Sequence, residues 1–322
     1  MTLGLACGAS SSEVCRGAER CDCYPNGTCD DGLACLSNKC VNQNGGAGGT
    51  NPTGGTGGTH ASGGTTTGPL PTPASPNCTD ISLTSGRLTA DYVTMFVPVN
   101  GSDKQYLAQT NWWHWFQQQT VTVNGLSFTV GNPMGAITPD NSPTGFPSLY
   151  IGEYTGHAGK GSNLPKQVSA LTSVNTVFVT NANSKGHSNY NATYDVWFTP
   201  TSAPLPADQY DPGMGGAYLM VWFFMPTDRQ PRGFPETSSH MVPGLSGTWD
   251  VWIDHTDPLC VSYVSTTPLE KLDFDLNNFI QDSVSNGYGI TSSMYLSIVF
   301  AGFEIWGGGD GVQAKAFCAN VL

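Results

Sequence analysis

The sequence is short of charge, and most of the charge it has is negative. Only 11% of its 322 residues are charged, with 12 basic against 24 acidic side chains, for a formal net charge of −12. A chain this poor in basic residues does not offer the positive surface that nucleic acids and anionic membranes require. We therefore expect neither as a partner.

Long apolar runs and metal-binding patterns are missing as well. No run of 18 apolar residues occurs, so the sequence contains no candidate transmembrane helix. The histidines are scattered without the spacing of metal ligands. We expect no metal, no cofactor and no transmembrane segment, and we expect the chain to act as a monomer.

Cysteine is plentiful, with 10 residues, and it is concentrated near the N-terminus. Six cysteines lie within residues 15–41 among turn-forming residues: Cys15, Cys21, Cys23, Cys29, Cys35 and Cys40. A segment this short cannot build a hydrophobic core, so we expect disulfides to hold it together, in an oxidising compartment. Zinc is disfavoured because the segment contains no histidine. The sequence does not choose among the possible pairings.

The segments on either side of this module indicate an extracellular or surface location. Residues 1–14 include Leu3-Gly4-Leu5-Ala6-Cys7-Gly8, which is similar to the end of a bacterial lipoprotein signal with Cys7 as the lipidated residue. An ordinary N-terminus with a stray cysteine is the alternative. Residues 42–77 are Gly, Thr, Asn, Ser and Pro with little apolar content, which predicts a flexible linker. We expect a secreted or cell-surface protein.

From residue 78 to residue 322 the sequence changes to short β-rich runs separated by turn residues. The predicted strands are 92–97, 119–123, 126–130, 174–180, 193–198, 218–224, 248–253, 260–264, 294–300 and 313–317. Residues 273–285 have helical spacing and predict one helix. Many short strands with a single helix favour an all-β sandwich, jelly roll or barrel.

Residues 217–224 form the most apolar of these runs and predict a strand buried on both faces. Side chains alternate along a strand, so two rows are expected. One row holds Tyr218, Met220, Trp222 and Phe224, and the other holds Ala217, Leu219, Val221 and Phe223. The first row is bulky, aromatic and partly polar, which suits the floor of a sugar-binding cleft. The second row is typical of a plain core.

Ordered motifs across residues 78–322 resemble those of glycoside hydrolase family 12. They are Asn111-Trp112-Trp113, 145–152 (GFPSLYIG), 164–171 (LPKQVSAL), 192–198 (ATYDVWF), 219–222 (LMVW), the helix at 274–284 and 301–309 (AGFEIWGGG). The resemblance implies a two-sheet β-jelly roll, a concanavalin-like sandwich with one helix. It also implies a retaining β-1,4-glucanase of the endoglucanase or xyloglucanase type, with cellulose, xyloglucan or mixed-linkage glucan as substrate.

The resemblance places Glu304 at the family's acid/base position. The chemistry of the residues supports this role independently, because a Glu among Phe303, Ile305 and Trp306 is expected in a poorly hydrated site, which raises a carboxyl pKa. Five residues are expected to line the substrate site: Trp112, Trp113, Met220, Trp222 and Trp306. The tryptophans offer faces for stacking against sugar rings.

The sequence departs from the family at the expected nucleophile, where Tyr218 replaces a Glu, and at Phe300, where close relatives often carry Gln. Three explanations are open. Tyr218 is itself the nucleophile, with Asp195 as its base. Alternatively, Asp195 or Asp211 acts directly or activates water. The third is that hydrolysis has been lost and the domain is a non-catalytic β-glucan-binding protein.

The three cysteines of the main domain leave one pairing unexplained. Cys78, Cys260 and Cys318 cannot all pair with one another, so one of them is free or pairs with Cys7.

Overall fold

The structure, a computed structural model, describes residues 28–29, 33–36, 39–42, 80–113, 119–132, 142–183, 189–227 and 229–322. The chain divides into two compact units, one formed by Met1–Ser12 with Pro73–Leu322 and the other by Glu13–Thr72. The predicted lipoprotein segment with Cys7, the linker from residue 43, and the side chains of Cys15, Cys21, Cys23, Cys35 and Cys78 lie outside the described residues.

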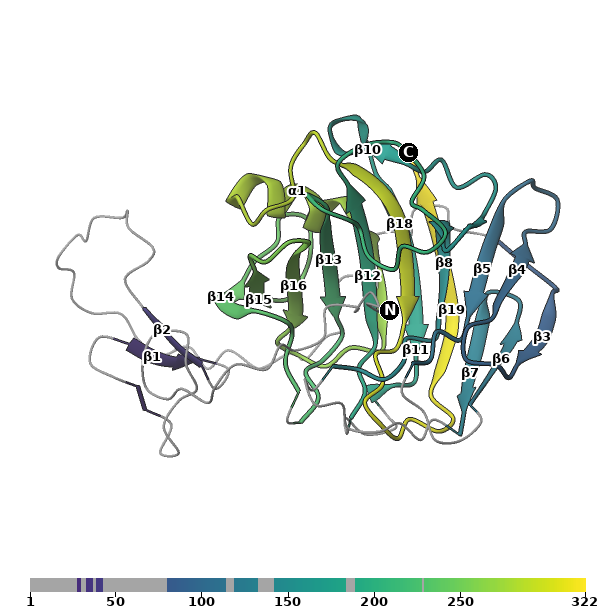
Figure 1. Cartoon of the computed structure of the whole chain (residues 1–322). Coiled ribbons are helices and arrows are strands. Elements are labelled where there is room, and N and C mark those ends of the chain that lie inside the picture. The colour runs from purple at the N-terminus through teal and green to yellow at the C-terminus, as the bar shows by residue number, and fades with distance from the viewer. Residues whose placement is uncertain are drawn as a thin grey trace, which may run out of the picture. The chain divides into compact units, whose positions relative to one another are not determined.

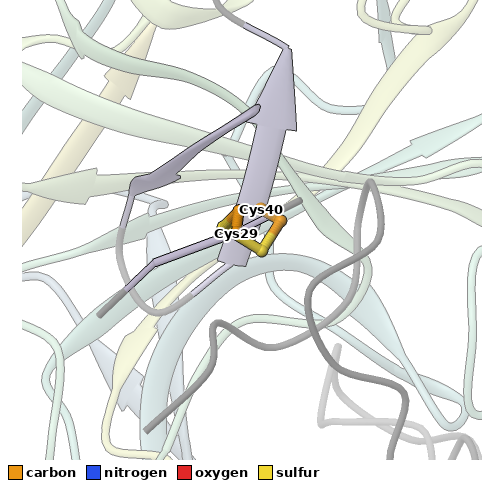
Figure 2. The surroundings of a disulfide bond; sticks show 2 residues. All are labelled: Cys29 and Cys40. Atoms are coloured by element: carbon orange, nitrogen blue, oxygen red, sulfur yellow. A yellow bond between two sulfur atoms is a disulfide. The ribbon is translucent and has the colours of Figure 1, made fainter. Parts of the chain in front are cut away.

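In the smaller unit, β1 (Leu33–Leu36) and β2 (Lys39–Asn42) form an antiparallel hairpin. Cys40 of β2 forms a disulfide with Cys29 (Figure 2). The prediction that disulfides hold this segment together is confirmed for this pair.

The larger unit is built from two β-sheets (Figure 1). One has 11 strands, with the main order β14-β15-β16-β13-β12-β18-β8-β5-β4 and with β9 and β10 paired at β8 and β18. Their bounds are β4 Thr94–Pro98, β5 Gln105–Gln109, β8 Ser148–Tyr154, β9 His157–Ala158, β10 Lys166–Gln167, β12 Thr193–Thr199, β13 Ala217–Trp222, β14 Phe234–His240, β15 Trp249–Asp254, β16 Leu259–Ser265 and β18 Tyr295–Gly302. Within this sheet β13 and β16 pair parallel.

The second sheet has six strands in the order β17-β11-β19-β7-β6-β3. Their bounds are β3 Ser85–Leu88, β6 Thr120–Asn124, β7 Ser127–Gly131, β11 Val174–Thr180, β17 Lys271–Asp275 and β19 Gln313–Val321. A 3-10 helix spans Val168–Ala170, and the described α-helix, α1, spans Asn277–Asn286. The predicted all-β fold of two sheets with one helix is confirmed.

The main core lies between the two sheets and is joined across them by aromatic contacts. Phe178 of β11 packs on Tyr194 of β12, with ring centroids 5.7 Å apart, and on Phe223, at 5.1 Å. Tyr194 also reaches Phe317 of β19, at 6.3 Å. Because side chains alternate along each strand, the residues between these core positions face the opposite side of the 11-stranded sheet.

The predicted helix begins later than its sequence pattern indicated. Its expected first residues, 273–275, are instead the end of the strand β17, Lys271–Asp275, which pairs with β11. Strand pairing prevails there because Phe274 is buried on the core side while Asp275 accepts a hydrogen bond from the backbone N–H of Val174, at 2.7 Å. The helix ends at a glycine, Gly287, whose φ of 71° is left-handed, a common way for a helix to end.

Candidate active site

A second cluster of buried side chains lies on the side of the 11-stranded sheet away from the core, and we call this side the outer face. Its members are Leu107, Phe146, Tyr150, Tyr154, Trp197, Tyr218, Met220, Trp222, Trp252, Cys260, Val264, Ile298, Phe300 and Trp306. The two rows predicted for β13 lie on opposite faces of the strand. The row that begins with Tyr218 belongs to this cluster, and the row that begins with Ala217 belongs to the core. The exception is Phe224, because β13 ends at Trp222 and Phe224 packs in the core against Tyr190.

Glu304 lies two residues after the end of β18 and is completely buried. Its neighbours Phe303 and Ile305 belong to the core, whereas Trp306 belongs to the outer face. Asn191 fixes Glu304 in place. Its side-chain amide donates to Glu304 Oε2 at 2.8 Å, and its Oδ1 accepts from the Glu304 backbone N–H at 3.2 Å. Among the described residues, the buried Glu304 Oε1 has no hydrogen-bond partner.

Asp195 is the second buried carboxyl of the outer face. It lies on β12 between Tyr194 and Val196, which both point into the core. Asp195 pairs with Met220 of β13 on one side and with Phe300 of β18 on the other. Burial in these apolar surroundings raises the pKa of Asp195 to about 7. Its Oδ1 likewise finds no hydrogen-bond partner in the described part of the chain.

Asp195 and Glu304 are electrostatically coupled. Burial raises the pKa of Glu304 well above its ordinary value, the hydrogen bond from Asn191 lowers it, and the negative charge of Asp195 raises it further. Ionisation of Asp195 therefore favours the protonated form of Glu304. The outer face thus carries one carboxyl that ionises near neutral pH and another that remains an acid.

Tyr218 lies close to Asp195 but is poorly suited to form a phenolate. Its cross-strand partner is Trp197, and the two rings are 5.5 Å apart. Burial raises the pKa of Tyr218 well above 10, and the charges of Asp195 and Asp211 raise it further, while Arg232 lowers it. An un-ionised phenol beside a carboxylate is the expected state at neutral pH.

Asp211, the other carboxylate considered from sequence, is engaged in a turn. Its Oδ1 accepts hydrogen bonds from the backbone N–H of Gly213 at 2.8 Å and from the side chain of Gln209 at 3.3 Å. Asp211 is thus committed to loop structure near Tyr218.

Phe300 explains much of the low polarity around Asp195. Its ring centroid lies 4.8 Å from that of Tyr150, 5.4 Å from Tyr154 and 5.5 Å from Trp197. An aromatic ring thus stands opposite Asp195 and removes water from that position, which is the physical cause of its raised pKa.

The predicted substrate-binding residues are partly brought together. Met220, Trp222 and Trp306 belong to the outer-face cluster, and Trp113 packs against it. Trp222 and Trp306 have ring centroids 6.1 Å apart. Trp112 instead packs in the core with no exposed surface, because the bridge it makes with Gly145 turns its side chain inward. We assign it no part in the site.

Sequence reasoning missed Asn191, Trp197 and Trp252. Trp197 stands two residues after Asp195, so alternation along a strand could have placed it on the same face. Trp252 belongs to β15, and its face becomes evident only from the pairing with β16. Asn191 precedes β12, and its bond to Glu304 joins segments 113 residues apart.

Two further properties bear on the class of site. The described residues contain no group of three or more His, Cys, Asp or Glu side chains that could hold a metal ion. Of the helices in the described ranges, none is long and apolar enough to cross a membrane.

Comparisons with known proteins agree with this architecture. Among curated proteins, the chain is similar to a probable cellulase Cel12b of Mycobacterium tuberculosis, with 29% identity over 161 residues, covering 50% of this chain and 99% of that protein. It is also similar to endoglucanase S of Pectobacterium parmentieri, with 25% identity over 243 residues, covering 69% of this chain and 83% of that protein.

The fold agrees with solved structures. The endoglucanase cel12A from Rhodothermus marinus superposes with a TM-score of 0.64 at 29% identity, covering 74% of this chain and 99% of that chain. Residues 104–322 match the sequence profile of glycosyl hydrolase family 12. The chain therefore belongs to glycosyl hydrolase family 12.

Proposed function

We propose that the protein hydrolyses β-1,4-linked glucan on its outer face, with Glu304 as general acid and Asp195 as its partner. The observation that carries the proposal is the pair of coupled, buried carboxyls with different tendencies to ionise. Most glycoside hydrolases cleave a glycosidic bond with two carboxyl groups, one protonated and one ionised. The names of the related cellulase and endoglucanases support the substrate class.

In this proposal Glu304 donates its proton to the glycosidic oxygen as the bond breaks. Burial keeps Glu304 protonated at neutral pH, and the Asn191 amide holds the carboxyl through Oε2. The unpartnered Oε1 is then the atom that faces the leaving group. A general acid needs a pKa raised in this way to remain protonated at the working pH.

Asp195 supplies the second carboxyl, and we propose that it activates water. It stands opposite Phe300, which lies two residues before the end of β18 and four residues before Glu304. We propose that the two carboxyls are separated by the roughly 6.5–9.5 Å of inverting enzymes, which leaves room for a water molecule, and not by the gap of about 5–5.5 Å of retaining ones. The family resemblance implied retention, so inversion would be a departure caused by Tyr218.

The test is to incubate the full chain with carboxymethyl cellulose, xyloglucan and mixed-linkage glucan and to measure reducing ends. We expect turnover that Glu304→Gln and Asp195→Asn each abolish, with Tyr218→Phe retaining most of it. Loss of activity in Tyr218→Phe together with full activity in Asp195→Asn would instead identify the phenol as the nucleophile. The anomeric configuration of the first product, followed by NMR, reports inversion.

A non-catalytic glucan-binding protein is the second candidate. It is favoured by Tyr218 and Phe300, which put aromatic rings where the resemblance leads us to expect Glu and Gln. The same incubation separates the two functions. Binding without release of reducing ends above the Glu304→Gln control would establish the binding protein and rule out the hydrolase.

We also propose that the protein works outside the reducing cytoplasm, as a secreted or cell-surface protein. The Cys29–Cys40 bond and the disulfide-bonded state of Cys260 and Cys318 support this location.

A further inference from the structure

A pair of uncharged polar side chains interrupts the apolar surface of the outer face. Gln109 of β5 and Ser148 of β8 are cross-strand partners. Their chain neighbours Ala108 and Leu149 pack in the core, so alternation along the strands turns Gln109 and Ser148 to the outer face. Gln109 is 3% exposed and Ser148 is completely buried. Two polar groups are thus held among side chains that are mainly aromatic and aliphatic.

The hydrogen bonding of this pair leaves part of the amide group unpaired. Gln109 Nε2 donates to Ser148 Oγ at 2.9 Å. Within the described ranges this is the only hydrogen bond of the Gln109 side chain. A side-chain amide offers two N–H donors and one acceptor oxygen, so Oε1 and the second N–H have no partner there. Burial of such groups without hydrogen bonds costs free energy, which a ligand with hydroxyl groups would recover.

The pair lies beside the proposed general acid. Ser148 pairs across the ladder with Gly302, which is two residues before Glu304. The segment that leads into β8 stays alongside the chain beyond this point, because the backbone N–H of Ile305 donates to Gly145 O at 3.0 Å. The amide partner of Ser148 on β5 is one strand further from β18. The pair thus flanks the acid on the β8 side of β18.

We propose that Gln109 binds a hydroxyl group of the glucan unit next to the cleaved bond, and that Ser148 positions its amide for this contact. The inference rests on the proposed function. Gln109 Oε1 accepts a hydrogen bond from the sugar hydroxyl, and the second amide N–H donates to a hydroxyl oxygen. A hydroxyl whose hydrogen is replaced by a carboxymethyl group cannot donate to Oε1. The subsite therefore favours unmodified glucan over carboxymethyl cellulose.

A structural role for the pair and a binding role make opposite demands on stability. If the bond from Gln109 to Ser148 served only to hold β5 against β8, its loss would lower the free energy of unfolding. If the pair serves a ligand, apolar side chains of similar shape relieve the cost of burying unpaired polar groups, and stability stays equal or rises. The same variant therefore separates the two roles.

The first experiment measures binding without turnover. Every protein carries Glu304→Gln, and cellohexaose is titrated by calorimetry. We expect Gln109→Leu/Ser148→Ala to raise Kd about tenfold, as the loss of one or two hydrogen bonds requires. The matched control is Asn175→Leu/Ser173→Ala, because Asn175 Nδ2 of β11, in the six-stranded sheet, donates to Ser173 Oγ at 3.3 Å. This control should keep the Kd of the parent.

The outcomes separate this inference from the proposed function. An unchanged Kd in Gln109→Leu/Ser148→Ala, or an equal rise in the control, overturns the inference alone. Absence of cellohexaose binding by the Glu304→Gln parent overturns the proposed function and the inference with it.

Urea unfolding of the same proteins gives the second readout. We expect the midpoint of Gln109→Leu/Ser148→Ala to equal or exceed that of the parent. A lower midpoint assigns the pair a structural role and overturns the inference. If the double variant fails to fold, Ser148→Ala alone, which removes a single oxygen atom, decides in the same titration, where an unchanged Kd overturns the inference.

Discussion

At the scale of single residues, the active-site proposal depends on how two carboxyls and one phenol share a dry environment. Asp195 and Glu304 are both buried, and each is surrounded by rings or amides rather than by opposite charge. Their ionisation is therefore governed by desolvation, which favours the neutral form. This has consequences for stability as well as for chemistry.

Asp195 should make the protein less stable as pH rises. Its pKa is raised to about 7 in the folded state, against about 3.9 in an unfolded chain, so the folded state holds the proton more tightly. The free energy of unfolding should fall between about pH 4 and pH 7. We expect Asp195→Asn to be more stable than wild type by ~2–4 kcal/mol at pH 8 and equal to it below pH 4.

Urea unfolding at a series of pH values checks this expectation. Asp103→Asn, on an exposed turn, is the matched control and should follow the wild-type profile. A stability difference for Asp195→Asn that does not change with pH would contradict the assignment.

Tyr218 offers a gain-of-function prediction at the same scale. Tyr218→Glu restores the carboxylate that the family resemblance leads us to expect, next to Asp195. We expect kcat on xyloglucan to rise about 100-fold, with product of retained configuration, since a positioned carboxylate replaces a phenol. Tyr218→Gln introduces a side chain of the same shape as Glu but without its charge, so it should show no rise in kcat. Equal activity of the two variants would argue against a nucleophilic role at this position.

At the scale of elements, β13 shows how one strand serves both stability and binding. Leu219 faces the core and Trp222 the outer face. We expect Leu219→Ala to lower the free energy of unfolding by ~2–5 kcal/mol while leaving glucan affinity nearly unchanged. Trp222→Ala should weaken glucan binding about tenfold through loss of a stacking surface. Chemical unfolding measures the first effect, and pull-down on insoluble glucan measures the second. The assignment of faces would be refuted if Leu219→Ala weakened glucan binding and Trp222→Ala lowered only the free energy of unfolding.

Much of the position and burial of the individual strands was predictable from the sequence. Residues 174–180 and the alternation of 217–222 appear as predicted, because alternating or continuous apolar runs report burial directly. The helix start, the inward turn of Trp112 and the place of Phe224 were not predictable. Each depends on a partner far away in sequence, such as β11 for β17, and local periodicity carries no information about that partner.

The site itself was predictable in its parts but not in its connections. Glu304, Asp195 and Tyr218 stood out by motif and by resemblance, and the structure places all three on or beside one sheet. The link from Asn191 to Glu304 was not indicated, and the sequence left open which of Cys78, Cys260 and Cys318 are disulfide-bonded, since sequence cannot show which distant groups meet.

At the scale of the whole molecule, the net charge of −12 should distinguish charged from neutral substrates. Carboxymethyl cellulose is anionic, so like charges oppose its approach at low salt, and screening at about 0.1 M ionic strength limits this to about 10 Å. We expect KM for carboxymethyl cellulose to fall as salt rises, while KM for neutral xyloglucan stays constant. Parallel changes for both substrates would show that charge has no part in the effect.

The position of β18 also has a consequence for how the protein is made. This strand, Tyr295–Gly302, lies between β12 and β8, although both are synthesised well over 90 residues earlier (Figure 1). A nascent chain therefore carries two unpaired strand edges until almost the whole polypeptide is available. Such edges promote aggregation, so we expect their protection during synthesis to affect the yield of folded protein. Because Glu304 follows β18 in the sequence, it is synthesised only after the strand that closes the gap between β12 and β8. A nascent chain that ends before β18 therefore lacks the proposed general acid.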